Sequence, residues 1–116
     1  MFSYESMIVY KKAFEANQQV YRLLKGNKTI VSYAKNQLGR ASLSIMLNIA
    51  EGSAKFSSKD RSNFFVTARG SAFECSSLVT FLFAEQELRV ELKEELYASY
   101  VEISKILFTM IKNLQT

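Results

Sequence analysis

The chain has 116 residues, with 15 Lys and Arg against 11 Asp and Glu, one cysteine, and no histidine, tryptophan or proline. A chain of this length forms one domain, so we expect residues 1–116 to fold as a single unit. The absence of histidine excludes Ser-His-Asp and Cys-His catalysis and imidazole metal ligands. A single cysteine excludes an intrachain disulfide and the cysteine-based zinc motifs.

The remaining composition is that of an ordinary globular protein. Hydrophobic residues make up 48% of the chain and charged residues 22%, which excludes a disordered chain. No apolar stretch approaches the roughly 18 residues that cross a bilayer, and the first residues lack the pattern of a secretory signal. Cys75 is most simply a buried thiol in a reducing compartment. We therefore expect a cytoplasmic protein with no membrane contact and no cofactor.

Glycine positions and apolar periodicity predict a helical chain. Because proline is absent, the strongest helix breakers are the glycines at 26, 39, 52 and 70. Apolar residues recur at steps of three and four over about residues 4–24, 30–50, 58–85 and 90–114. Gly26-Asn27 is a natural stop for the first helix, and Ser57 with Asp60 resembles a capping box before the third. Short connections make sequential helices antiparallel, so the expected fold class is all-α, an antiparallel up-down-up-down four-helix bundle.

The third and fourth predicted helices carry more apolar side chains than the core of a bundle requires. The surplus includes Phe64, Phe65, Phe73, Phe81, Phe83, Tyr97, Tyr100, Val101, Phe108 and Ile111. Excess apolar surface on a small protein marks an interface, so we expect a homo-oligomer. The alternative is that these aromatic residues lie deep in the core of one protomer.

A line of polar residues runs down the second predicted helix and faces another on the third. The expected structural network consists of Gln37, Arg40, Ser44, Asn48, Glu51, Arg69, Ser71 and Glu74. If the turn is centred near residue 55, Arg40 lies near Ser71 and within one turn of Glu74. We therefore expect a buried network in which Arg40 pairs with Glu74, and Glu51 with Arg69 is a second candidate pair.

Two further expectations concern the same helix pair. Gly70 in mid-helix costs about 1 kcal/mol relative to Ala, which predicts a close helix approach opposite Ala41. Glu51 and Glu74 should lie several turns apart, which argues against paired acid–base catalysis. We expect no catalytic site and no metal site, and a carboxylate-dependent hydrolase or metal enzyme is the minor alternative.

One longer pattern spans these two helices. It contains Gln37-Leu38-x-Arg40-Ala41-x-x-Ser44-Ile45, Asn48-Ile49-Ala50-Glu51-Gly52, Ser58-Lys59-Asp60, Phe64-Phe65, and Ala68-Arg69-Gly70-Ser71 with Glu74. Together with the opening Ile8-Val9-Tyr10-Lys11-Lys12-Ala13, it resembles the 23S rRNA-intervening-sequence family of four-helix-bundle proteins. The similarity covers nearly the whole chain.

The resemblance implies an antiparallel bundle that assembles as a ring-like homopentamer. Members of this family are encoded in insertions within bacterial large-subunit rRNA genes. The related accessory variability determinants of diversity-generating retroelements form basic pentamers that bind nucleic acid and a reverse transcriptase. The resemblance implies rRNA, another nucleic acid or a reverse transcriptase as a partner, and it implies no catalytic site.

Charge is distributed unevenly along the chain. Residues 1–70 hold 11 basic and 4 acidic side chains, a net charge of +7, whereas residues 71–116 hold 4 basic and 7 acidic, a net charge of −3. The candidate nucleic-acid-binding residues in the positive part are Lys11, Lys12, Arg22, Lys25, Lys28, Lys35, Lys55, Lys59 and Arg61. We expect a non-enzymatic oligomeric protein that binds structured RNA or a ribonucleoprotein through these residues. The alternative is a protein–protein interaction scaffold with no direct nucleic-acid binding, whose surface charge serves solubility.

Overall fold

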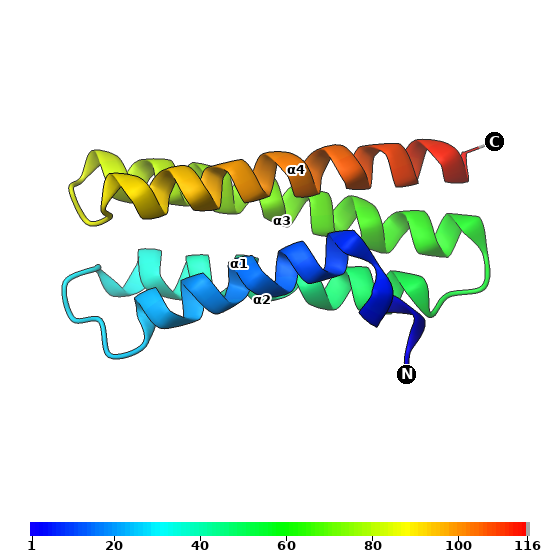
Figure 1. The fold of residues 1–116 in the computed structure, drawn as a ribbon, viewed down its shortest axis with the longest axis horizontal. Coiled ribbons are helices and arrows are strands. Elements are labelled where there is room, and N and C mark those ends of the chain that lie inside the picture. Colours follow the sequence, from blue (N-terminus) through cyan, green and yellow to red (C-terminus); the bar gives the residue numbers. More distant parts are fainter. Residues whose placement is uncertain (116) are drawn as a thin grey trace.

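The computed structural model describes residues 1–115 and contains four long helices in up-down-up-down order (Figure 1). A short 3-10 turn, η1 (Ser3–Ser6), precedes the helices α1 (Ile8–Leu24), α2 (Ser32–Ser53), α3 (Ser58–Ala84) and α4 (Val90–Leu114). The described residues contain no strand, so the all-α prediction is confirmed. Thr116, the last residue of the expected domain, lies outside the described residues.

Each helix packs against the two helices that neighbour it around the bundle. α1 contacts α2 and α4, and α3 contacts the same two helices, while α1 and α3 lie diagonally opposite each other. The bundle measures 45 × 24 × 22 Å. In Figure 1 the α1–α2 and α3–α4 turns lie at one end, and both chain ends lie at the other end with the α2–α3 turn. The outer groove between α1 and α2 therefore lies on the opposite side of the molecule from the groove between α3 and α4.

Local signals in the sequence account for most helix boundaries. Gly26 adopts a left-handed φ of 70° just after α1, as predicted for a C-terminal stop. The side chain of Asn27 then accepts hydrogen bonds from the backbone N–H groups of Thr29 and Ile30, both at 2.9 Å. This turn delays α2 until Ser32, slightly later than expected. The first helix also begins later than predicted, because the backbone is extended at Met7.

The two ends of α3 are both capped. The Ser57 hydroxyl accepts a hydrogen bond from the backbone N–H of Asp60 at 3.0 Å, which confirms the predicted N-cap. At the other end the N–H groups of Gln86 and Glu87 donate to the carbonyls of Phe83 and Leu82, both at 2.9 Å. This is the Schellman arrangement, and it holds Gln86 in the left-handed region with φ 64°. A residue with a side chain therefore occupies a position that favours glycine.

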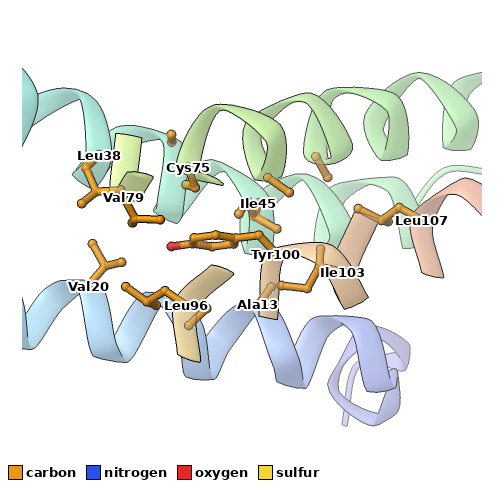
Figure 2. Packing of buried hydrophobic residues seen from close by; sticks show 14 of the residues in the cluster. Ala13, Val20, Leu38, Ile45, Cys75, Val79, Leu96, Tyr100, Ile103 and Leu107 are labelled. Atoms are coloured by element: carbon orange, nitrogen blue, oxygen red, sulfur yellow. The ribbon is translucent and has the colours of Figure 1, made fainter. Parts of the chain in front are cut away.

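The core is apolar and closely packed around one tyrosine. The ring of Tyr100 crosses its centre between Cys75, Ile45 and Ile103 (Figure 2), and only 1% of Tyr100 is exposed. Ser42 is the one polar residue of the described chain that is fully buried. Phe65 also belongs to this core, so part of the predicted surplus of aromatic residues is explained within one protomer.

Gly52 marks a close approach of α2 and α3. A Cβ placed on Gly52 would lie 2.6 Å from Cε1 of the buried Phe65 ring and 3.1 Å from Cβ of Phe64. A Cβ on Gly70 would meet nothing within 4 Å, and Gly70 is exposed. The predicted contact between Gly70 and Ala41 is wrong. The reason is helical phase, since Ser71 faces α2 and the preceding residue points about 100° away from it, towards solvent.

Candidate functional site

Polar side chains do connect α2 and α3, but along the outer edge of the helix pair. Gln37 donates a hydrogen bond to the carboxylate of Glu74. The hydroxyls of Ser44 and Ser71 lie 2.9 Å apart, and the Asn48 amide donates to the Ser44 hydroxyl and carbonyl at 2.9 Å. These five residues form a polar ladder that favours one register of the two helices over its neighbours. They are half-buried or exposed, so the expected burial of the network is wrong.

The two predicted ion pairs of this network are absent from the described residues. Arg40 and Glu51 are exposed, and neither side chain makes a hydrogen bond or an ion pair within residues 1–115. Arg69 turns away from α2 and donates from Nε to the Ser104 carbonyl of α4 at 3.2 Å. Its guanidinium lies over the rings of Phe73 and Phe108, with centroids at 4.7 and 5.3 Å.

The two ion-pair predictions fail for the same reason, which is the angular position of each arginine around its helix. Arg40 follows Gln37 by three residues, which is far enough around α2 to place it outside the ladder. Arg69 precedes Ser71 by two residues, about 200° around α3, so it faces α4 instead.

The carboxylates of this helix pair form no catalytic arrangement in the part of the chain that the structure describes. Glu74 is engaged by Gln37, and Glu51 is exposed and separate. No three Cys, Asp or Glu side chains within residues 1–115 gather into a group that could hold a metal ion.

A small group of buried polar atoms lies at the centre of the core. Burial raises the pKa of the Cys75 thiol to about 12, although the neighbouring Tyr100 hydroxyl acts in the opposite direction. Burial and the adjacent thiol also raise the pKa of Tyr100. The enclosed Tyr100 hydroxyl lies beside the Cys75 thiol and the Ser42 hydroxyl, close enough to influence its pKa, but neither enclosed hydroxyl reaches a partner in the described residues with the geometry of a hydrogen bond. Both Cys75 and Tyr100 therefore stay protonated and closed to solvent, which makes a reactive thiol site untenable.

The nine candidate basic residues fall into separate groups. Arg22, Lys25, Lys28 and Lys35 lie around the α1–α2 turn at one end of the bundle, and Lys55, Lys59 and Arg61 lie around the α2–α3 turn at the other (Figure 1). Lys11 and Lys12 lie in the first turns of α1, nearer the second group. The bundle is 45 Å long, so the two end groups cannot form one continuous surface on a single protomer.

Several of these basic side chains already have partners. Lys12 forms an ion pair of 2.7 Å with Glu102, and hydrogen bonding to that carboxylate raises the pKa of Lys12. Lys35 donates to the Asn27 carbonyl. Lys25 lies over the Tyr21 ring at 5.7 Å. The ion pair of Lys12 with Glu102 lowers the local positive charge. The first part of α1 is therefore a weaker candidate for binding nucleic acid than the two basic ends of the bundle.

Exposed apolar side chains gather on two opposite faces. The α1/α2 face presents Phe14, Tyr21, Leu43 and Leu47, with a groove of about 330 Å³ between Tyr21 and Leu43. The α3/α4 face presents Phe73, Tyr97 and Phe108, with a smaller groove of about 150 Å³ beside Val101. Some of the aromatic residues left over after the core is filled therefore lie on the long sides of the bundle, whereas others, including Tyr33 and Phe56, lie at its ends.

One exposed residue has no counterpart among the sequence-based predictions. Phe56 lies in the α2–α3 turn and is fully exposed. The signal for it was present in the sequence, because a large apolar residue stands in a polar turn directly after Lys55. Its neighbour Lys55 lies over the ring of Phe64 at 5.0 Å.

These features define a four-helix bundle with basic ends and apolar sides. Residues 5–109 match the 23S rRNA-intervening sequence protein family, and the chain belongs to that family. The predicted resemblance is thereby confirmed at the level of the family.

Comparison with solved structures supports the fold. The chain is similar to a protein of unknown function from the S23 ribosomal protein family of Bacteroides thetaiotaomicron, with a TM-score of 0.83 and 25% sequence identity. The match covers 90% of this chain and 99% of the other. No curated protein gives a significant match. Within residues 1–115, no helix combines the length and the apolar character needed to cross a membrane.

Proposed function

We propose that this protein is a non-enzymatic, self-assembling bundle that binds structured RNA, alone or within a ribonucleoprotein, through its basic ends. The observation that carries the proposal is that two apolar patches lie on opposite sides of the bundle, whereas most of the candidate lysines and arginines lie around the turns at its two ends. Copies that pack side by side would cover the apolar patches and leave the basic residues accessible. Membership of a family described by its rRNA-intervening sequences supports RNA as the partner.

The proposed assembly is a ring of five copies. The α1/α2 and α3/α4 faces lie on opposite sides, so contact between them is head-to-tail, and such contacts close into rings or continue as filaments. Arg69 of the α3/α4 face, already between two rings, could also contact the aromatic side chains Phe14 and Tyr21 of the α1/α2 face of the next copy. In a ring with parallel bundles, each rim would collect five copies of one basic group, with a total net charge of about +20 on the assembly.

An RNA mobility-shift experiment tests the RNA-binding function. Labelled fragments of large-subunit rRNA should shift at about 50 mM salt, with affinity falling steeply as salt rises, because each phosphate contact releases counterions. Replacing Lys25 and Lys28 by Gln should weaken binding and flatten the salt dependence. Lys105→Gln, a change on the side of α4, is the matched control and should have little effect. Absence of any shift at low salt would contradict the proposal.

Light scattering tests the assembly independently. A single-copy species at high micromolar concentration would contradict the ring. Phe73→Glu and Tyr21→Glu should each disrupt a ring, since they alter opposite faces of the same head-to-tail contact. Glu at either position should leave the bundle folded, because both side chains are exposed.

A protein–protein scaffold is the second candidate, favoured by the two apolar faces. Its partner would be another protein, such as a reverse transcriptase, rather than nucleic acid. A stoichiometric protein partner that survives nuclease treatment, combined with no RNA shift, would favour this function over the first.

A further inference from the structure

The α2–α3 turn displays an aromatic ring with no structural role in the protomer. Phe56 is fully exposed, and its ring makes no aromatic or cation–π contact within residues 1–115. A large apolar side chain in water contributes nothing to folding. Phe56 is therefore available to a partner.

The turn around Phe56 is well ordered by hydrogen bonds on both sides. The backbone N–H groups of Ala54 and Lys55 donate to carbonyls of the last turn of α2, at 3.1 and 3.2 Å. On the other side, the Ser57 hydroxyl caps α3. The ring is thus carried on a short, pre-organised connection between two long helices, which limits the entropy lost on binding.

The surroundings of the ring are cationic. In the sequence Lys55 directly precedes Phe56 and Lys59 follows it by three residues, and both are exposed. Arg61 follows in the first turn of α3, with its Nε enclosed but without a hydrogen-bond partner in the described chain. Asp60 is the single acidic residue between 54 and 61. Lys55 lies over Phe64 rather than over Phe56, so the faces of the Phe56 ring stay open.

We infer that this turn binds single-stranded RNA, with an unpaired base stacked on Phe56 and the flanking phosphates contacted by Lys55 and Lys59. Stacking of bases on exposed aromatic rings beside a cationic path is the general mode of single-strand binding, and it tolerates any base sequence. A duplex offers no free base to the ring, because its bases already stack on one another. This inference rests on the proposed RNA-binding function and assigns it to unpaired nucleotides at one end of the bundle.

A tryptophan placed at the turn gives a direct test, because the chain contains none. In Phe56→Trp, a single-stranded oligouridine should quench the indole fluorescence, whereas a blunt RNA duplex should leave it largely unchanged. Phe73→Trp is the matched control: Phe73 is also exposed but lies midway along α3, away from the basic turns at both ends of the bundle. Its tryptophan should not respond to the oligouridine.

The affinity measurement completes the experiment. Phe56→Ala should weaken binding of the oligouridine by about 10-fold or more and leave duplex binding unchanged, as expected for one lost stacking contact. Circular dichroism should show an unaltered fold, since the ring lies in solvent. The inference is overturned, and the proposed function stands, if wild-type protein binds rRNA fragments while Phe56→Trp shows no quenching and Phe56→Ala binds as wild type does.

The other outcomes are equally decisive. If no RNA binds, both the inference and the proposed function fail. A blue shift of the indole emission of Phe56→Trp with phosphatidylserine vesicles, without quenching by RNA, would overturn the inference in favour of a membrane contact.

Discussion

The contact at Gly52 gives a quantitative test of how α2 and α3 pack. In Gly52→Ala the new methyl carbon would lie 2.6 Å from the Phe65 ring, closer than two carbon atoms approach, and 3.1 Å from Cβ of Phe64, which is a tight contact. Phe65 is buried in the core, so the helices must separate or the ring must leave its rotamer. Overpacking of this kind costs about 1–3 kcal/mol, and the better helix propensity of Ala offsets about 1 kcal/mol of this, so we expect a net loss of stability of about 0–2 kcal/mol.

Gly70→Ala is the matched control for this change. It replaces the same residue type within the neighbouring helix, but a Cβ there meets no atom within 4 Å. Its only effect is on helix propensity, so it should stabilise the protein by up to about 1 kcal/mol. The helix-propensity gain is common to both variants, so their stabilities should differ by the overpacking cost alone, about 1–3 kcal/mol, or roughly 5–15 °C in melting temperature.

Urea and thermal unfolding, followed by circular dichroism at equal protomer concentration, measure both variants. Equal concentrations matter because self-association shifts apparent stability. If Gly52→Ala proves as stable as Gly70→Ala, the close approach at Gly52 does not exist. If the order is reversed, the close approach lies at Gly70, as the sequence had suggested.

Three further changes probe other features. Tyr100→Phe removes an enclosed hydroxyl that has no hydrogen-bond partner of good geometry in the described residues. The free energy of unfolding should stay unchanged or rise by about 1 kcal/mol, whereas a clear fall in the urea midpoint would mean that the hydroxyl is hydrogen-bonded. Gln86→Gly removes the steric strain of a side chain in the left-handed region and should raise the free energy of unfolding by about 0.5–1 kcal/mol, and with it the melting temperature. A lower melting temperature would count against the Schellman geometry. Burial raises the pKa of Cys75 from 9.0 to about 12, so above pH 9 the unfolded chain loses the thiol proton first and stability should fall towards pH 12. Between pH 9 and pH 12 the urea midpoint of Cys75→Ala should fall less steeply than that of the wild type. If both midpoints fall with the same slope, the pKa of Cys75 is not raised.

Most of the fold could be predicted from the sequence, because helix bounds depend on nearby residues. Gly26 ends α1 through its own backbone freedom, and Ser57 starts α3 with its own hydroxyl. Apolar periodicity then identified the faces that meet in the core. The remaining boundary errors lie at Met7 and near Ser32, where local hydrogen bonds hold the chain in turns instead of helix.

The candidate network was predicted less well, because it depends on the rotation of one helix against another. Gln37, Ser44, Asn48, Ser71 and Glu74 do meet across α2 and α3. Spacing along the chain gives each helix a polar line, but it does not say which members of the line turn towards the neighbour. A rotation of one residue, about 100°, decides whether a side chain is paired or in solvent.

The sequence by itself determined the helical class, the positions of the caps, the family and the net positive charge, since all of these follow from residue identity and short spacing. Only the tertiary structure decided that the basic groups lie at opposite ends, that some of the spare aromatic side chains gather on two opposite faces, and that Phe56 is left in water. These properties depend on how the four helices are rotated and stacked against one another. That arrangement results from the packing of the whole core, to which side chains from every helix contribute.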